Sequence, residues 1–315
     1  MGRDLQAGTK GLLVFVANEL GNFRHHREHL AHAALADGFT PILVAAPIGS
    51  TDGMNYEFRP VTIDRFKLNW WLDLKLLFFL LNILLVERPE GIHLINLKPY
   101  LFGGLLAQLA RRLGWKGTVV MTVPGLGRLY DIHDQSLVAQ IRRRLIEFCL
   151  RIATQDAHVT FETQHDRDFW LTRGLVGPSQ TVVTQGTGID LSRFFPLRKP
   201  TGRHMTVLFA GRLLATKGLD AFLQAATLTT HPKIAFLVAG FTESDPDAVS
   251  EAELRSHSSI RFLGAVSDMP ALLAETDIVI LPSRYNEGVP PHPHRSRRVR
   301  LRADCNTVRR ERDDH

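Results

Sequence analysis

The feature that most constrains the fold of this chain is the regular alternation of short apolar runs with amphipathic stretches. The apolar runs predict buried strands at 11–18, 41–47, 91–97, 118–125, 157–163, 180–190, 205–211, 233–240, 260–266 and 277–283. Helical spacing between them predicts helices at 23–37, 70–87, 101–113, 136–153, 217–229, 246–257 and 268–275. Repeated strand–helix order predicts an α/β protein with two doubly wound parallel sheets.

One segment interrupts the alternation and predicts a domain boundary. LSRFFPLRKPTGRH at 191–204 combines prolines, a glycine and basic residues between two strand patterns, which is typical of an interdomain linker. We therefore expect a first domain at 1–190 and a second at 205–290. Residues 291–315 carry no periodic pattern, and we expect them to be a disordered tail.

The net charge of +6 is concentrated in that tail. Residues 291–315 hold eight arginines and four acidic residues, which leaves a charge of +2 for residues 1–290. Because the folded part is nearly neutral, its composition argues against a nucleic-acid partner.

The apolar stretch 69–87 tests whether the chain enters a membrane. Asp73, Lys75 and Asn82 interrupt it, and the uncharged run 76–86 is too short to cross a bilayer. We interpret it as a buried helix; the alternative is a helix that dips its Trp, Phe and Leu side chains into the bilayer interface. The chain has two cysteines, whose spacing fits neither a disulfide framework nor a metal site, and its first residues are polar and show no signal peptide. These features favour a cytoplasmic protein.

The helix predicted at 136–153 begins at Ser136, a good N-cap residue. Its spacing places five apolar side chains on one face, namely Leu137, Ile141, Leu145, Phe148 and Ile152. We interpret the arginine run 142–144 as a solvated edge of this helix.

Four loops follow predicted strands and would meet at the carboxyl edges of the sheets, where ligands of doubly wound folds bind. They are Asn18–Asn22, the loop VPGLGRLYD at 123–131, Gly211–Gly218 and Asn286–Pro290. Arg212 and Lys217 could together neutralise a diphosphate, although either one alone would be an ordinary surface cation. A glycine before a helix, such as Gly21, permits close approach of an anion but is also common for purely steric reasons.

Taken together, these segments resemble glycosyltransferase family 4, the retaining enzymes of the GT-B fold, over nearly all of residues 11–290. GRLLATKG at 211–218 is similar to the family's phosphate-binding motif, and TGIDLSRFFP at 187–196 to its interdomain segment. FLGAVSDMPALLAETDIVILPSRYNEGVP at 262–290 resembles its donor-site stretch and ends in the first half of an E-x7-E motif. NELGNFRHHREHLAHAALADG and VPGLGRLYD resemble the branch that extends lipid-linked oligosaccharides.

The resemblance implies two Rossmann-like domains, the second incomplete, and a set of site residues. Arg212 and Lys217 would hold the donor diphosphate, and Glu287 would contact the hydroxyls of the transferred sugar. The remaining implied positions are Gly21 and Gly211 beside the diphosphate and Val266 near the nucleotide base.

The resemblance also implies the partners. These are a nucleotide-sugar donor, a UDP-sugar, and an undecaprenyl-diphosphate-linked sugar acceptor at the inner-membrane surface, with no metal and no further cofactor. Many relatives carry a histidine in the loop after strand 118–125, where this chain has VPGLG, so we assign no catalytic histidine. We expect His25, His26, His93 and His133 to lie on the surface or to pack.

The sequence after Pro290 departs from the family pattern, which continues as R-T-L-I-E-A-A-A-C-G. In a displaced frame, each codon takes its first two bases from the end of one present codon and its third from the start of the next. Codons for residues 291–300 then permit the family run, and the second glutamate of the motif falls at the position of Arg295. Our hypothesis is that a one-nucleotide frameshift produced residues 291–315. Strand 277–283 would then lose a covering helix and a neighbouring strand, and we expect little or no activity.

Competing interpretations concern both the tail and the function. A genuine arginine-rich tail would bind nucleic acid or lipid phosphate, but its interspersed acids and lack of aromatic residues oppose this. In place of a transferase, the chain could be a non-catalytic nucleotide-sugar-binding remnant, or a nucleotide-sugar 2-epimerase of similar architecture. The epimerase would need acid–base carboxylates and histidines, which the four loops do not show.

Overall fold

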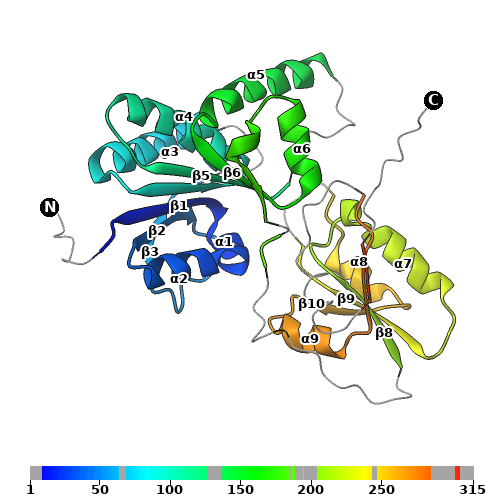
Figure 1. The fold of residues 1–315 in the computed structure, drawn as a ribbon. Helices are drawn as coiled ribbons and strands as arrows, with labels where there is room; N and C mark the ends of the chain where they lie inside the picture. The colour runs from blue at the N-terminus through cyan, green and yellow to red at the C-terminus, as the bar shows by residue number, and fades with distance from the viewer. Residues whose placement is uncertain are drawn as a thin grey trace. The chain divides into compact units, whose positions relative to one another are not determined.

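The computed structural model describes residues 9–63, 69–125, 136–184, 186–188, 194, 204–242, 247–284 and 302–305. The chain divides into two compact units, Met1–Thr187 and Gly188–His315. Each unit is built on its own parallel sheet (Figure 1).

The first unit contains a seven-stranded parallel sheet with the strand order β3-β2-β1-β4-β5-β6-β7. Its strands are β1 (Leu12–Glu19), β2 (Thr40–Ala46), β3 (Glu57–Pro60), β4 (Gly91–Ile95), β5 (Thr118–Val123), β6 (Ala157–Phe161) and β7 (Thr181–Val183). The central strands are continuous apolar runs because both faces of the sheet are covered by helices.

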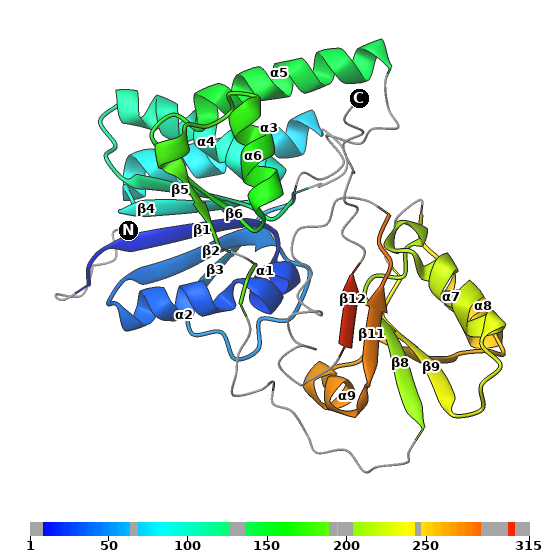
Figure 2. The same ribbon diagram turned by 45° about the vertical axis from the view of Figure 1, so that its right-hand side comes forward.

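Helices cover the two faces of this sheet unequally. One face carries α1 (Leu20–His26) and α2 (Glu28–Ala36). The other carries α3 (Trp70–Asn82, continued by a π-helical turn Ile83–Glu87), α4 (Leu97–Arg112), α5 (Leu137–Ala153) and α6 (Gln164–Thr172) (Figures 1 and 2). The larger core therefore lies on the α3–α6 side, where Trp170 is almost fully buried.

The second unit contains a five-stranded parallel sheet with the order β10-β9-β8-β11-β12. Its elements are β8 (Met205–Ala210), α7 (Leu219–Leu228), β9 (Ile234–Ala239), α8 (Glu251–Ser256), β10 (Arg261–Gly264), α9 (Met269–Glu275), β11 (Ile278–Leu281) and β12 (Arg302–Cys305). Helices α7 and α8 pack on one face, and α9 packs on the other with Phe194, a residue of the segment predicted as a linker.

The tail differs from the sequence expectation at one point. Residues 302–305 form β12, which pairs in parallel with β11 from Ile278 to Leu281 (Figure 2). The prediction of a tail disordered throughout is therefore wrong for these four residues, and β11 does not lack a neighbour. Strand pairing uses backbone groups, so an exposed sheet edge can recruit an extended segment of almost any sequence. The rest of the tail lies outside the described residues.

Other elements also differ from the sequence expectation in detail. The expected helix 23–37 is broken at Arg27, and the expected helix 246–257 is reduced to α8. Strand β3 and helix α6 were not expected, because EFRP and QHDRDFWLT contain no apolar run and no clear apolar stripe. The predicted N-cap is confirmed: the Ser136 side chain accepts a hydrogen bond from the Ala139 N–H at 3.2 Å.

In the described part of the chain, no helix is both long enough and apolar enough to cross a bilayer.

Candidate functional site

The carboxyl edge of the second sheet carries the strongest candidate site, at the junction of β8 and β11. The chain runs from β8 outward to β9 and β10, then returns to the opposite side of β8 as β11. Such a reversal creates a crevice beside the carboxyl ends of the two strands, where doubly wound proteins bind their ligands. The loop after β8 holds Gly211–Gly218, and Pro282–Arg284 follow β11.

Backbone and side-chain contacts hold these two loops together. The Arg284 N–H donates to the Thr216 carbonyl at 2.9 Å, and the Arg284 guanidinium pairs with the Asp220 carboxylate in the first turn of α7. Gly218 has a φ of +75°, and a Cβ at this position would lie 2.0 Å from the Pro282 carbonyl oxygen. Only glycine fits there, so the KG pair at 217–218 reflects a close approach between the loops.

A second close approach fixes the start of the β8 loop. A Cβ on Gly240, which follows β9, would lie 1.9 Å from the Gly211 carbonyl oxygen. The Gly211 N–H donates to the Ala239 carbonyl at 3.1 Å, and the Leu213 N–H donates to the Phe241 carbonyl at 3.2 Å. The loop that leaves β8 is therefore braced by the end of β9 before it reaches α7.

The braced loop carries both cations predicted to bind a diphosphate. Arg212 is partly buried directly after β8, and Lys217 ends a 3-10 turn (Ala215–Lys217) with only 8% of its surface exposed. Gly218 caps the following α7, so Lys217 lies beside the positive end of a ten-residue helix. A buried lysine is uncommon, and a cation beside a helix N-terminus provides positive charge of the kind that an anionic group requires.

Two further predicted residues belong to this edge by position. Val266 follows β10, partly buried, and packs against the cluster that contains Leu208 and Leu273. Its contact with a nucleotide base stays a prediction. Glu287 and the rest of Asn286–Pro290 lie outside the described residues. They follow β11, the strand adjacent to β8 in the sheet.

In the first unit, Gly21 is held by a backbone neighbour. Its N–H donates to the Ile48 carbonyl at 2.7 Å, and a Cβ on Gly49 would lie 2.8 Å from the Gly21 Cα. This contact between the first turn of α1 and the segment after β2 accounts for a glycine at position 21, where a Cβ would lie 3.0 Å from the Ile48 carbonyl oxygen. The approach of a diphosphate to Gly21 stays a prediction, and its amide already has a partner.

The first sheet has its own point of reversal between β1 and β4. Asn18 and Asn96 lie two residues beyond Val16 and Leu94, which pair across these strands. Asn96 has a φ of +77°, a strained conformation for a residue with a side chain, and the buried Asn18 Oδ1 has no hydrogen-bond partner among the described residues. Strain and an unsatisfied polar atom at a switch point are typical of a ligand-binding edge.

A row of polar side chains crosses the face of the first sheet that α1 and α2 cover. The His93 Nε2 lies 2.7 Å from the Thr122 Oγ1, which lies 2.8 Å from the Thr160 Oγ1. Burial, with a smaller contribution from the positive charge of Arg27, lowers the pKa of His93 to about 3. His93 is therefore neutral at physiological pH and serves as a packed hydrogen-bonding residue, as predicted.

Arg27 forms a buried ion pair with Glu162, which directly follows β6. Burial lowers the pKa of Arg27, while the charge of Glu162 and its hydrogen bond oppose this effect. The pair links the α1–α2 junction to the carboxyl end of β6. It can hold the loops at this edge in place.

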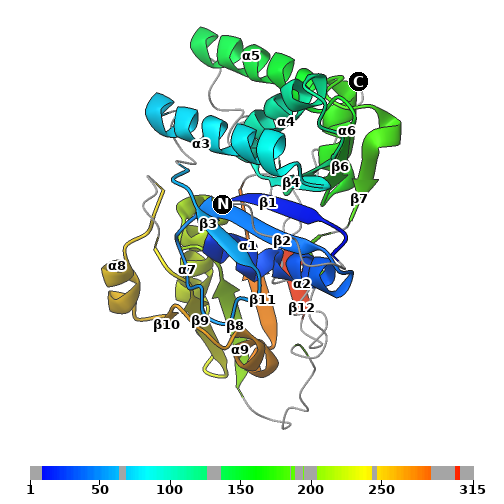
Figure 3. The same cartoon turned by 90° about the vertical axis from the view of Figure 1, so that its left-hand side faces the viewer.

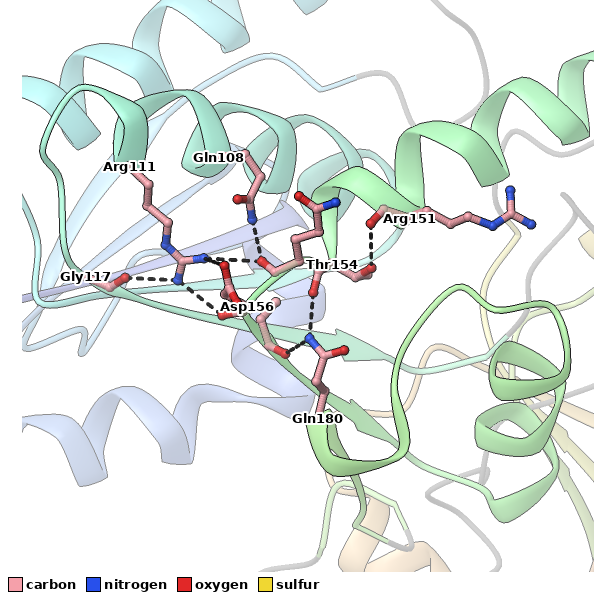
Figure 4. Close-up of polar contacts among 9 residues, drawn as sticks. Gln108, Arg111, Gly117, Arg151, Thr154, Asp156 and Gln180 are labelled. Atoms are coloured by element: carbon pink, nitrogen blue, oxygen red, sulfur yellow. Dashed lines mark hydrogen bonds and ion pairs between the residues drawn. The ribbon is translucent and has the colours of Figure 1, made fainter.

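The opposite edge of the first sheet holds a different polar cluster, shown in Figure 4. Arg111 donates to the carbonyls of Gln155, Asp156 and Gly117 at 3.2, 3.2 and 3.4 Å. Gln180 donates to the carbonyls of Thr154 and Ala157 at 2.9 and 3.1 Å. These groups bind the turn between α5 and β6 at the amino ends of the strands, so the shallow hollow beside them is structural.

Sequence reasoning missed several of these residues. The buried pair Arg27–Glu162 lies 135 residues apart, and a single sequence gives no signal for such a contact. The strained Asn96 lies inside the expected strand 91–97, whereas the observed β4 ends one residue before it, at Ile95. An asparagine near a strand end tolerates positive φ and could have drawn attention. Among the described residues, no three His, Cys, Asp or Glu side chains are arranged to hold a metal ion.

Comparison with known proteins identifies the domain that carries the β8 loop. Residues 204–293 match the family described as Glycosyl transferases group 1. This match confirms the family resemblance drawn from the motifs at 211–218 and 262–290.

One curated relative is similar over both units. It is the N,N'-diacetylbacillosaminyl-diphospho-undecaprenol alpha-1,3-N-acetylgalactosaminyltransferase of Campylobacter jejuni subsp. jejuni serotype O:2, 29% identical over 248 residues. The aligned region covers 75% of this chain and 62% of the relative. The chain thus spans less than two thirds of the length of that protein.

Solved structures share the fold over most of the chain. A glycosyltransferase from Rickettsia africae has a TM-score of 0.69 at 16% identity, over 93% of this chain and 78% of that one. The Anabaena protein HepE, solved with UDP and glucose, has a TM-score of 0.68 at 16% identity, over 93% of this chain and 80% of that one. The predicted fold class, two Rossmann-like parallel-sheet units of the GT-B type, is confirmed.

Proposed function

We propose that this chain is a retaining glycosyltransferase that moves a hexose or N-acetylhexosamine from a nucleotide-sugar to a lipid-linked or polysaccharide acceptor. The observation that carries the proposal is the loop 211–218. It carries Arg212 and places the buried Lys217 beside the N-terminus of α7, in the region that matches the group 1 glycosyltransferase family.

The chemistry follows from where charge develops. When the glycosidic bond to the nucleotide breaks, negative charge grows on the leaving diphosphate. Fixed cations and helix N–H groups aimed at that position lower the barrier, because they need no reorganisation. In this proposal Arg212 and Lys217 hold the diphosphate, Gly211 and Gly21 leave room for it, Val266 borders the base and Glu287 binds sugar hydroxyls. The reaction needs no metal ion.

The proposed donor is a UDP-sugar, and the proposed acceptor is an undecaprenyl-diphosphate-linked sugar at the inner-membrane surface. Support comes from the Campylobacter relative, whose name specifies a diphospho-undecaprenol acceptor, and from the Anabaena structure, which contains UDP. We place the chain in the cytoplasm, peripheral to the membrane.

A second candidate function is a nucleotide-sugar-binding protein without transfer activity. The sequence after Pro290 favours it, because Arg295 stands where the family motif has its second glutamate. Loss of a ribose-binding carboxylate would weaken donor binding and misplace the sugar relative to the acceptor.

Nucleotide release separates the two functions. The assay offers UDP-linked sugars to the 315-residue chain and to a version whose displaced frame after Pro290 is restored, each with and without an undecaprenyl-diphosphate-linked acceptor. We expect acceptor-dependent release of UDP from the restored chain and little from the 315-residue chain. Equal release by both chains would contradict the expectation that the displaced frame impairs activity, and no release by either would refute the transferase.

A further inference from the structure

Helix α5 turns its large apolar side chains toward solvent instead of toward the core. Leu137, Val138, Ile141, Leu145 and Phe148 are all exposed, Leu145 to 62%. The buried face of the same helix is made of the smaller Ala139 and Ala153, together with Leu150 and Glu147. The apolar face predicted from the sequence therefore exists but does not pack, whereas a surface helix of a globular protein normally faces its apolar stripe inward.

Helix α3 repeats this arrangement. Trp70, Trp71, Leu74 and Phe78 lie on one side of the helix and are exposed, Phe78 to 73%. Leu76 and Leu80 form the buried side. The rings of Trp70 and Trp71 stack with centroids 3.9 Å apart. The sequence interpretation of 69–87 as a buried helix is thus correct for one side of α3 only.

The two helices belong to one layer of the first unit. Helix α4 packs against both, on the same face of the sheet (Figure 3). Each follows a strand of a parallel sheet and so begins at the carboxyl edge. Trp70 and Leu137, at the starts of the helices, therefore lie toward the edge at which ligands of the fold bind.

The exposed charges on these helices are all basic, namely Lys75, Arg142, Arg144 and Arg151. Both acidic residues are buried and paired: Asp73 with Lys98 at 2.8 Å, and Glu147 with Arg173 at 2.9 Å. At the helical angle of 100° per residue, Arg142 and Arg144 flank the apolar face of α5 on its two sides. Burial of the acids leaves a surface of aromatic and aliphatic side chains bordered by positive charge.

We propose that the exposed faces of α3 and α5 form a docking surface for an anionic lipid bilayer. Tryptophan is favoured at the membrane–water interface, and basic side chains beside an apolar helix face bind acidic headgroups. A second copy of the chain fits less well, because a symmetric contact would bring the basic residues of both copies together. The proposal extends the proposed function, since a lipid-linked acceptor lies at such a surface.

The tryptophans provide a direct readout of docking. The chain has four, and Trp115 and Trp170 are buried, so fluorescence changes on vesicle binding report on Trp70 and Trp71. Titration with phosphatidylglycerol–phosphatidylcholine vesicles should shift the emission to shorter wavelength, and brominated acyl chains should quench it. Phosphatidylcholine alone should bind far more weakly.

Substitutions on α3 and α5 test which side chains contact the vesicle. Phe78→Ser and Leu145→Ser should each weaken vesicle binding about tenfold through lost apolar burial. Arg142→Gln and Arg144→Gln should each weaken it about fivefold and reduce its salt dependence. Leu228→Ser, which removes an equally exposed apolar side chain from α7, should leave binding unchanged.

Several outcomes would overturn the docking surface. These are no binding to anionic vesicles, binding that the α3 and α5 variants leave unchanged, or dimerisation in solution that the same variants abolish. None of these measurements requires donor or acceptor. If vesicle binding is found but neither the 315-residue chain nor the version with the restored frame releases UDP, the transferase is refuted and the docking surface stands.

Discussion

At the residue scale, Gly218 shows how a single position can constrain a site. Its positive φ and its contact with Pro282 join the loops after β8 and β11. The side chain of Lys217 is placed by the turn that Gly218 ends. A glycine in a sequence signals conformational freedom in general, but the carbonyl that excludes a Cβ is visible only in the structure.

Gly218→Ala should destabilise the second unit and weaken donor binding. We expect a loss of about 2–4 kcal/mol in unfolding free energy, from the left-handed backbone and from the clash with Pro282. Gly264→Ala is the matched control: Gly264 has a φ of +72°, and a Cβ added there would meet no atom within 4 Å, so this variant isolates the backbone cost of about 1–2 kcal/mol. Denaturant unfolding measures the unfolding free energy of both variants. Equal losses for Gly218→Ala and Gly264→Ala would contradict the proposed contact between Gly218 and Pro282.

At the scale of elements, the strands follow from the sequence more reliably than the helix faces. The apolar runs at 11–18 and 205–211 correspond to β1 and β8 within one residue at each end, because parallel strands buried on both faces need continuous apolar sequence. Periodicity in α5 located the apolar stripe but not the side that packs. Strand β3 lies at an edge with exposed residues, so its sequence carries no strand pattern.

The polar row His93–Thr122–Thr160, which crosses β4, β5 and β6, should make stability depend on pH. The pKa of His93 is about 3 in the folded chain against an ordinary value of 6.5, so the unfolded chain binds the additional proton between these values. Stability is therefore lost as the pH falls below about 6.5, by up to ~1.4 kcal/mol per pH unit from this residue.

His93→Gln should remove this pH dependence while His158→Gln, an exposed histidine on β6, should retain it. Unfolding free energies measured between pH 4 and 7 for the three proteins test this. Burial raises the pKa of the Asp166 carboxyl, so Asp166 makes the folded chain more stable as the pH falls, opposite to the effect of His93. The unfolding free energies of the variants must therefore be compared with one another at each pH. A slope that His93→Gln leaves unchanged would rule out His93 as its source.

At the scale of the whole molecule, alternating strands and helices were enough to predict two doubly wound sheets. The same order placed Arg212 and Lys217 at a carboxyl edge, since parallel strands have all their carboxyl ends on one side. The Arg27–Glu162 pair and the pairing of β12 with β11 were not predictable, because each joins segments that are separate in the sequence. The frameshift hypothesis for 291–315 stays a prediction, which resequencing across codons 285–320 would test.

The central claim is that the loop 211–218 binds the diphosphate of a nucleotide-sugar. Calorimetric titration of the 315-residue chain with UDP tests it without requiring transfer. We predict that Arg212→Gln and Lys217→Gln each weaken UDP binding by about 10-fold to 100-fold, because each removes a charge-assisted hydrogen bond. Lys233→Gln, a control on the same unit before β9, should have no effect. The account would be contradicted if both site variants bound UDP as tightly as the unsubstituted chain. It would also be contradicted if the unsubstituted chain did not bind UDP.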